Sequence, residues 1–383
     1  MTNHNPVFTS SNATGSFSEF ANTSNSTTAH TLTGTMNFTD SDRSDSHTTS
    51  ATLQSAVLSS GSIIPASSLA HFQTAMTSQI LTDSNGNGKL RWSFSDIDDD
   101  FDFLAKNQSL VLTYNIRVFD NHGGSALRTV KVTVTGTDDK PIFAMAATAT
   151  VTEQADKTLS LSSDTVQIAL GFTDEDLTNT GHTASVTGVS ASGNTSGLLL
   201  SNSQLKSFLD INNVVKTSGS STGTINTTFS APDLVFDYLS AGEQLDLTYT
   251  VKLDDNAGGI STQTVVVTVI GTNDKPIYLS GPEFENLVED ENVSPSGNLT
   301  ADGDLLFADI DLHDTHSVST TVTASRSGGG AVPIPDATFL AAFAAIVDPD
   351  STNHLLGEVD WEFALQNSAA GFLNSGETLT LVY

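Results

Sequence analysis

The sequence predicts an all-β protein made of tandem β-sandwiches, and three observations support this prediction. Runs of alternating apolar residues, rich in Val and Thr, are typical of half-buried strands, clusters of Gly, Asn and Ser separate these runs, and segments with a helical period are few and short. In the stretch 249–277, two such runs flank a turn at 254–259 and lead into a polar linker that contains Pro276. We therefore expect a β-hairpin followed by a linker.

An internal repeat of about 135 residues organises the chain. An earlier copy of the stretch begins at Tyr114, 135 residues before Tyr249. The 383 residues hold nearly three such repeats, each long enough for its own core. We expect repeat 1 at 1–137, starting on a linker, repeat 2 at 138–272 and repeat 3 at 273–383. Repeat 3 stops before its final hairpin, so we expect the chain to be a fragment of a longer array.

The composition of the chain limits the classes of molecule that it is expected to bind. The chain has 44 acidic and 14 basic residues and a net charge of −30. Nucleic acids and anionic membranes require a basic face, so neither is expected, whereas a bound cation or a need for solubility would each account for the acidity. There is no cysteine, which excludes disulfides and thiolate metal sites. No apolar run approaches about 18 residues and the start lacks the features of a signal peptide, so an exported parent chain would carry its address elsewhere.

Aromatic residues recur at matching strand positions, and we expect them in the cores rather than on sugar-binding surfaces. They are Trp92, Phe94, Phe229, Trp361 and Phe363. A short amphipathic segment in the middle of each repeat predicts one or two helical turns. Its phenylalanines are expected to be in register with one another, at Phe72, Phe208 and Phe343.

An acidic cluster follows an early strand in every repeat. Its members are Asp40, Asp42 and Asp45; Asp174 and Asp176, with Asn179 in the third place; and Asp309, Asp311 and Asp314. Ca²⁺ takes about six to eight oxygen ligands, so other groups would have to contribute. The recurring candidates are linker residues, hairpin-turn residues and early glutamates: Asp138, Asp139, Asn273, Asp274, Asp120, Asp254, Glu19, Glu153 and Glu289. These residues could instead be turn formers and solubilising charges, but their convergence in register favours calcium.

Two further motifs predict structure rather than calcium ligation. His47, His182 and His316 recur just after the acidic cluster, and because histidine prefers softer metals than Ca²⁺ we expect structural hydrogen bonds. The run 83–88 resembles the start of an EF-hand loop, but Phe94 stands where such a loop needs its glutamate. We therefore expect a hairpin turn there.

The sequence resembles two related families of extracellular repeat. The linker VTVIGTNDKPI at 267–277 resembles the VxDxNDNxP linker of cadherins, and FTDEDLTNTGHT, FDYLSAGEQLDLTY and the following linker are similar to the tandem VCBS-type repeats of giant RTX-like bacterial adhesins exported by type I secretion. The resemblance covers all three repeats, except for the missing end of the third. It implies tandem cadherin-like or Ig-like Greek-key β-sandwich domains in an extended rod, with short helical turns.

The resemblance also implies a calcium cluster at each junction between repeats. Between repeats 2 and 3 the matching residues are Glu153, Glu243, Asn273, Asp274, Asp309 and Asp311. Between repeats 1 and 2 they are Glu19, Asp138, Asp139, Asp174, Asp176 and Asp254, with Gln108 standing where repeat 2 has Glu243. At the N-terminal edge Asp40, Asp42 and Asp120 face only Asn3, His4 and Asn5, so we expect a weak or empty site there.

These patterns predict a calcium-rigidified extender segment of a large secreted bacterial surface adhesin with a role in cell adhesion or biofilms. Its partners would be neighbouring repeats of the same chain and, through other domains, a host or surface ligand, at the cell surface or outside the cell. The alternative is a carbohydrate- or protein-binding module, marked by exposed aromatic residues in the variable segments 52–88, 186–222 or 320–357. No nucleophile motif or phosphate loop supports an enzyme.

Overall fold

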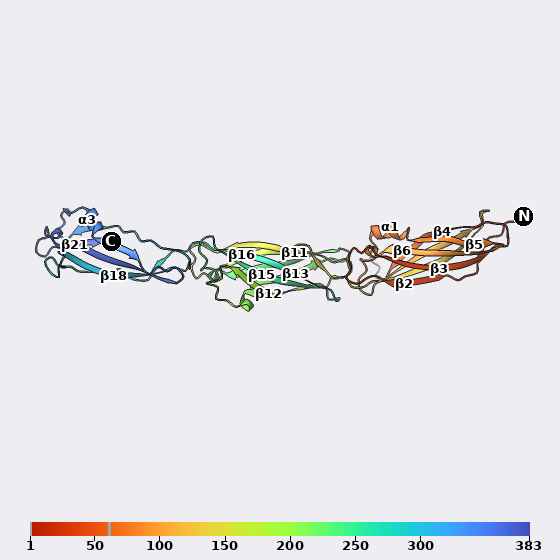
Figure 1. Cartoon of the computed structure of the whole chain (residues 1–383), viewed down its shortest axis with the longest axis horizontal. Coiled ribbons are helices and arrows are strands. Elements are labelled where there is room, and N and C mark those ends of the chain that lie inside the picture. The colour runs from red at the N-terminus through yellow and green to blue at the C-terminus, as the bar shows by residue number, and fades with distance from the viewer. Residues whose placement is uncertain (1, 60–62) are drawn as a thin grey trace.

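The protein is an extended rod made of three bodies of β-strands in line (Figure 1). The structure is a computed structural model that describes residues 2–59 and 63–383. Residues 60–62 of the predicted variable segment 52–88 lie outside the described residues. The N-terminus lies at one end of the rod, and the colours follow one another along its length, so each body consists of consecutive residues (Figure 1).

The first body is a sandwich of two four-stranded sheets. One sheet has the order β1-β3-β6-β5, with strands Val7–Phe8, Ala29–Thr39, Asn87–Ile97 and Met76–Ser84. The other has the order β2-β8-β7-β4, with strands Ala13–Ser18, Ser125–Thr135, Ser109–Phe119 and Thr48–Leu58. All neighbouring strands are antiparallel except β2 and β8, which are parallel. This arrangement is that of an immunoglobulin-type Greek-key sandwich, so the predicted fold class is confirmed.

The second body repeats this arrangement with β9 to β16. Its sheets are β13-β14-β11-β9, formed by Leu209–Lys216, Thr222–Pro232, Ser163–Thr173 and Ile142–Phe143, and β10-β16-β15-β12, formed by Ala147–Thr152, Ile260–Ile270, Gln244–Asp254 and Thr183–Gly193. The third body has one four-stranded sheet, β17-β18-β21-β20, formed by Ile277–Tyr278, Asn298–Ala308, Leu356–Gln366 and Phe343–Val347. Its second sheet pairs β19 (Thr323–Arg326) with β22 (Leu379–Val382).

Each sandwich carries one short α-helix and one 3-10 turn. The helices are α1 (Ala66–Phe72), α2 (Asn202–Lys206) and α3 (Asp336–Ala341), and the turns are η1 (Asp98–Asp100), η2 (Asp233–Val235) and η3 (Asn367–Ala369). Each turn directly follows the long central strand of its sheet, namely β6, β14 or β21. In the first two sandwiches this placement brings the turn to the end that faces the next body, where Asp98 accepts from Phe20 N and Asp233 from Gln154 N.

The cores arise from strict alternation along the strands. On β7 the residues Leu110, Leu112, Tyr114, Ile116 and Val118 are all fully buried, and the residues between them face outwards. The predicted core aromatics Trp92, Phe94 and Phe229 are buried, as expected. In the third body Trp361 and Phe363 are half-buried.

A conserved hydrogen bond shows how the helices correspond between sandwiches. Tyr114 Oη donates to the carbonyl of Phe72 at 2.7 Å, and in the other bodies Tyr249 donates to Leu205 and Tyr383 to Phe339. The counterparts of Phe72 are therefore Leu205 and Phe339. The prediction that Phe208 and Phe343 are in register with Phe72 is wrong, because the helices have seven, five and six residues and the spacing along the chain changes accordingly.

The variant Tyr114→Phe should lower the stability of the first sandwich by about 1–3 kcal/mol, since it removes the donor to the buried Phe72 carbonyl. Urea unfolding followed by Trp92 fluorescence in a Trp361→Phe background reports on this sandwich, because Trp92 and Trp361 are the two tryptophans of the chain. Tyr278→Phe, at an exposed tyrosine, is the control. An equal midpoint shift in both variants would contradict the role of this bond.

Candidate metal centres

Eight carboxylates are buried together at the boundary between the first and second sandwiches, called here the first boundary. They are Glu19, Asp98, Asp102, Asp138, Asp139, Asp174, Asp176 and Asp255, and each is at most 8% exposed. The first sandwich, the linker 136–141 and the second sandwich all contribute. Two lysines lie nearby: Lys106 acts electrostatically on Asp138, and Lys216 donates to the carbonyls of Asp176 and Asn179 at 2.7 and 2.9 Å.

Backbone donors fix one oxygen of several of these carboxylates and leave the other without a partner. Glu19 Oε1 accepts from Thr137 N at 2.5 Å, while Asp139 Oδ1 accepts from Thr23 N at 3.0 Å. The N–H of Asp139 itself donates to Asp176 Oδ2 at 3.2 Å. Six buried oxygens then have no hydrogen-bond partner: Glu19 Oε2, Asp102 Oδ1, Asp138 Oδ1, Asp139 Oδ2, Asp176 Oδ1 and Asp255 Oδ2.

Burial and mutual repulsion raise the pKa values at the first boundary. The pKa of Glu19 rises to about 10, chiefly because burial disfavours its charged form and further because Asp139 and Asp176 lie nearby. The same cause, burial first, raises the pKa of Asp176 to about 8 and that of Asp102 to about 7. These carboxylates therefore require either protons or a cation between them at neutral pH.

The boundary between the second and third sandwiches, the second boundary, has the same construction. Its buried carboxylates are Glu153, Asp233, Asp237, Asp274, Asp309 and Asp311, each at most 3% exposed. Single oxygens of Glu153, Asp237 and Asp274 lie within 4.8 Å of one another. Five buried oxygens have no hydrogen-bond partner: Glu153 Oε1, Asp233 Oδ2, Asp237 Oδ1, Asp274 Oδ2 and Asp311 Oδ1. Burial raises the pKa of Asp311 to about 7 and that of Asp237 to about 6.

The donor sets at both boundaries fit Ca²⁺. The unpartnered atoms are hard carboxylate oxygens, which Ca²⁺ prefers, and each boundary supplies several of them from three parts of the chain. Orphaned buried oxygens are rare in folded proteins and call for an explanation such as an ion. A divalent cation would supply the missing partner to each and offset the repulsion that raises their pKa values.

Most of the predicted ligands lie at these boundaries. Glu19, Asp138, Asp139, Asp174 and Asp176 are buried at the first, and Glu153, Asp274, Asp309 and Asp311 at the second. Asn273 is exposed and its amide donates to the carbonyl of Asp274.

Glu243 lies apart from the carboxylate cluster. It accepts from Ser240 N at 3.1 Å and forms an ion pair with His313 at 3.0 Å. Gln108 occupies the corresponding place in the first sandwich, where its side-chain oxygen accepts from Ala105 N at 3.0 Å. Both side chains therefore close a turn. This geometry gives no reason for the predicted loss of a metal ligand at Gln108.

The structure does not bring Asp254 into the first boundary. Asp254 ends β15, is partly exposed and forms an ion pair with Lys252 at 3.1 Å. Its neighbour Asp255 is buried and accepts from the N–H groups of Ala257, Gly258 and Gly259, with Oδ2 left unpartnered. Asp255, not Asp254, lies 135 residues after Asp120 and is therefore its counterpart in the repeat. Neighbouring residues of a strand point to opposite faces, so Asp254 and Asp255 have different surroundings.

Sequence reasoning missed a pair of acidic residues in each of the first two sandwiches. Asp98 and Asp102 belong to the first boundary, and Asp233 and Asp237 to the second. They lie within or just after η1 and η2 and recur at a spacing of 135 residues, which was the available signal. In the third sandwich Asn367 and Gly371 stand at these places.

The N-terminal edge carries a smaller acidic group. Oxygens of Asp40, Asp45 and Asp120 lie within 4.8 Å of one another. The expected neighbours are in contact: Asn3 Nδ2 donates to Asp120 at 2.9 Å, and the His4 N–H donates to Asp42 at 2.7 Å. The first of these bonds gives a partner to Asp120 Oδ2, whose counterpart at the first boundary, Asp255 Oδ2, has none.

The recurring histidines make the expected structural hydrogen bonds. His47, His182 and His316 contact Asp40, Asp174 and Asp309 through Nε2 at 3.1, 2.5 and 2.8 Å. Each histidine thereby holds the first aspartate of its acidic cluster in place. The predicted hairpin turn at 83–88 is also present, between β5 and β6, with Asn85 and Gly86 at positive φ.

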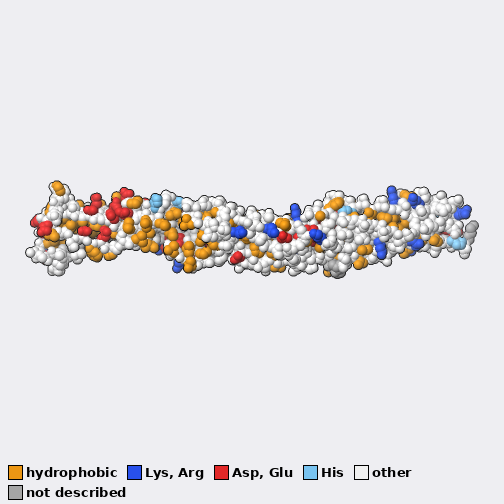
Figure 2. Space-filling view, turned by 90° about the horizontal axis from the view of Figure 1, so that it is seen from below, with side chains coloured by type: hydrophobic (Ala, Val, Ile, Leu, Met, Phe, Trp, Pro, Cys, Tyr) orange, Lys and Arg blue, Asp and Glu red, His pale blue; other side chains and the backbone are white. Residues whose placement is uncertain are grey.

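Exposed acidic residues form a separate group. The segment 273–383 holds 18 of the 44 acidic residues and two of the 14 basic ones. Figure 2 shows many of these acidic side chains on the surface of the third body. A cluster there, Asp304, Glu358 and Asp360, is exposed or only half-buried, so water solvates it and it gives no reason to place an ion.

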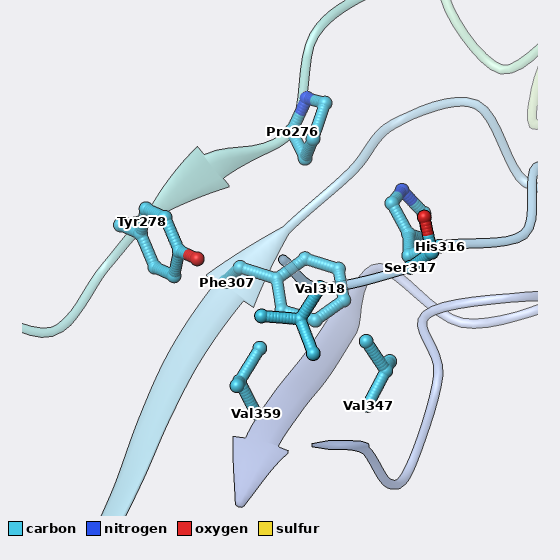
Figure 3. A pocket seen from close by; sticks show the side chains of 8 residues that line it. All are labelled: Pro276, Tyr278, Phe307, His316, Ser317, Val318, Val347 and Val359. Carbon is cyan, nitrogen blue, oxygen red and sulfur yellow. The ribbon is translucent and has the colours of Figure 1, made fainter. Parts of the chain in front are cut away.

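A small apolar hollow lies in the third sandwich near the second boundary (Figure 3). Pro276, Tyr278, Phe307, His316 and Val359 are among its lining residues. Its volume of ≈ 80 Å³ is far below the range of about 300–1,000 Å³ that is usual for small-molecule sites. It is a gap in the core beside His316 rather than a substrate pocket.

No helix among the described residues is long and apolar enough to cross a membrane. A scan against protein-family models gives no match, and neither does a search of curated proteins.

Among the solved structures similar to this chain are extracellular cadherin domains. Protocadherin gamma B2 domains 1–5 are 14% identical, with a TM-score of 0.36 and coverage of 99% of this chain and 59% of that one. Human CDH23 EC21-23 is 13% identical, with a TM-score of 0.38 and 99% coverage of both chains. Mouse cadherin-23 EC22-24 is 17% identical, with a TM-score of 0.34, covering 95% of this chain and 90% of that one. At these identities and TM-scores the likeness assigns no ligand or function to this chain.

The midpoint of thermal unfolding in chelator should fall as the pH rises from about 4 to about 8. Raised folded-state pKa values, such as about 8 for Asp176 and about 7 for Asp102 and Asp311, mean that the protonated forms favour the fold. Their contribution is complete below the unfolded pKa of about 4 and is lost as the pH rises through the folded values. Circular dichroism with chelator and with excess Ca²⁺ measures this effect, and the gap between the two midpoints should widen with pH. A gap independent of pH would contradict the assignment.

Asp255→Asn should weaken Ca²⁺ binding at the first boundary by at least about 10-fold, because it removes one charge from the buried group. Asp254→Asn, one residue earlier, should leave the affinity unchanged, since Asp254 is directed toward Lys252. Calorimetric titration of the full chain distinguishes the two. A larger loss of Ca²⁺ affinity in Asp254→Asn than in Asp255→Asn would instead favour Asp254 as the ligand.

Proposed function

We propose that this chain is a calcium-rigidified extender segment of a large secreted bacterial surface adhesin. One observation carries the proposal: at each of two boundaries, buried carboxylates from two sandwiches and the linker between them have oxygens without partners. Three such bodies in line form a rod (Figure 1), which suits a spacer that holds a distant adhesive part away from a cell. The bacterial adhesin context rests on the resemblance of the linker and strand frames to VCBS-type repeats.

One recurring leucine contributes to the direct contacts across each boundary, beside the bond from Lys106 to the Ala257 carbonyl at the first and the Glu243–His313 ion pair at the second. Leu177 N donates to the carbonyl of Phe103 at 3.4 Å, and its side chain packs against the core of the first sandwich. Leu312 is the counterpart: its N–H donates to the carbonyl of Tyr238 at 3.3 Å and it packs against the core of the second sandwich. A leucine contact resists separation but fixes an angle poorly, so the carboxylates around it decide whether the boundary stays straight.

The buried carboxylates make the straight form dependent on cations. With the oxygens ionised and unpaired, repulsion among them opposes the close approach of sandwich, linker and sandwich. Ca²⁺ bound there offsets this charge and, because it binds the ordered form, stabilises that form by mass action. Affinities typical of extracellular modules, about 10⁻⁴ to 10⁻³ M, would leave the sites empty in the cytosol and filled outside the cell. The chain would then be flexible before export and stiff after it.

The alternative function, a carbohydrate- or protein-binding module, lacks its expected feature. Within the described parts of 52–88, 186–222 and 320–357, no aromatic side chain is in the exposed class. Phe72 and Phe339, which lie in two of these segments, are fully buried. The extender function is therefore the one that the side chains support.

Small-angle X-ray scattering tests the proposal on the full chain. The maximum dimension should be larger, and the scattering that of a stiff rod, in millimolar Ca²⁺, whereas chelator should give a shorter and more variable particle. An unchanged maximum dimension on chelation would sink the proposal.

A charge-matched pair of variants separates specific binding from general screening. Asp139→Asn combined with Asp274→Asn removes one buried linker carboxylate at each boundary and should keep the flexible form in Ca²⁺. Asp210→Asn combined with Asp336→Asn removes the same charge from exposed positions and should behave like the unaltered chain. If both pairs stiffen equally, the linker carboxylates do not hold the ion.

A further inference from the structure

A histidine and two aspartates converge between α1 and η1 of the first sandwich, and none of the three is among the acidic residues described above. His71 lies in the last turn of α1, Asp96 near the end of β6 and Asp100 at the end of η1. One ligand atom from each lies within 4.8 Å of the other two. His71 Nδ1 is 2.6 and 2.7 Å from the two oxygens of Asp100.

The three side chains leave a buried charge unsatisfied. Asp100 is 4% exposed and the Oδ2 atom of Asp96 is buried without a hydrogen-bond partner. One oxygen of Asp96 and one of Asp100 lie within 4.8 Å of each other, so a proton or a cation between them would offset the repulsion of the two carboxylates. His71 is more than half exposed, which leaves a path from solvent to this point.

The group occurs as a set in one sandwich. The tyrosine bonds to Phe72, Leu205 and Phe339 place Gln204 and Thr338 at the position of His71. The strand pairing and the 3-10 turns place Ala231 and Leu365 at the position of Asp96, and Val235 and Ala369 at that of Asp100. None of these six residues is charged. All three ligand types therefore appear together in the first sandwich and are replaced together in the other two.

We propose that His71, Asp96 and Asp100 form a binding site for a divalent transition-metal ion, with Zn²⁺ as the probe. An imidazole nitrogen and two carboxylate oxygens, with water completing the shell, suit Zn²⁺, whereas Ca²⁺ takes oxygen ligands only. The ion would join the helix α1 to η1, the turn that also carries Asp98 of the first boundary. The site stands on its own residues and does not depend on calcium binding at the boundaries.

Calorimetric titration of the full chain with Zn²⁺, in millimolar Ca²⁺ to saturate the boundary carboxylates, tests this site. We expect one Zn²⁺ ion whose affinity falls at least about 100-fold in His71→Gln, which introduces the residue of the second sandwich, and in Asp100→Asn. His354→Ala, at an exposed histidine of the third sandwich, should bind Zn²⁺ like the unaltered chain. Circular dichroism verifies that each variant is folded.

Two further readouts distinguish the site from a structural ion pair. Zn²⁺ should raise the urea midpoint reported by Trp92 in the Trp361→Phe background, and His71→Gln should abolish that rise without changing the Ca²⁺ titration. The absence of Zn²⁺ binding in the unaltered chain, or binding that His71→Gln and Asp100→Asn leave intact, overturns the proposal. If Ca²⁺ fails to stiffen the chain while Zn²⁺ still binds, the extender function is overturned and the Zn²⁺ site is not.

Discussion

The burial of carboxylate oxygens that have no hydrogen-bond partner is the constraint on which the rest of this rod depends. At each boundary, backbone N–H groups hold one oxygen of a carboxylate and leave the other without a hydrogen-bond partner. The oxygens are therefore positioned before any ion arrives, which reduces the ordering that binding has to impose. The same positioning raises the pKa of Glu19 to about 10, since it is buried among other acids. In the proposed function, order at the boundaries and cation binding would be one equilibrium.

The sandwiches themselves do not share this dependence. Their cores consist of alternating apolar residues on long strands, with β7 and β15 each contributing five fully buried side chains. Folding of each body and alignment between bodies are thus governed by different forces, the first by apolar burial and the second by charge. For the proposed calcium-dependent extender, this separation would let the cation concentration alter the shape of the rod while the sandwiches stay folded.

The sequence predicted the strands, the repeat and most of the buried acids, because period-two alternation and a fixed spacing are visible in one dimension. It placed Asp254 where Asp255 lies, since adjacent aspartates at a strand end point to opposite faces and the turn geometry decides which is buried. Sequence reasoning missed Asp98 and Asp102, because they lie on either side of the buried Phe101 in a stretch whose apolar residues indicate a core strand. Sequence reasoning also paired the wrong helix residues between the sandwiches, because α1 and α2 differ in length. The hydrogen bonds of Tyr114 and Tyr249 show which helix residues correspond.

The segment 98–102 shows how one short turn can serve two kinds of cation chemistry. Asp98 and Asp102 accept from the N–H groups of Phe20 and Asn25 and belong to the first boundary, where six buried carboxylate oxygens have no hydrogen-bond partner. Asp100 lies between them in sequence but contacts His71 on the side of α1. Alternate residues of a tight turn project in different directions, so neighbouring aspartates meet different partners. The exposed imidazole beside Asp100 and the unpartnered carboxylate oxygens at the first boundary would favour a softer ion and calcium, respectively, within a few residues.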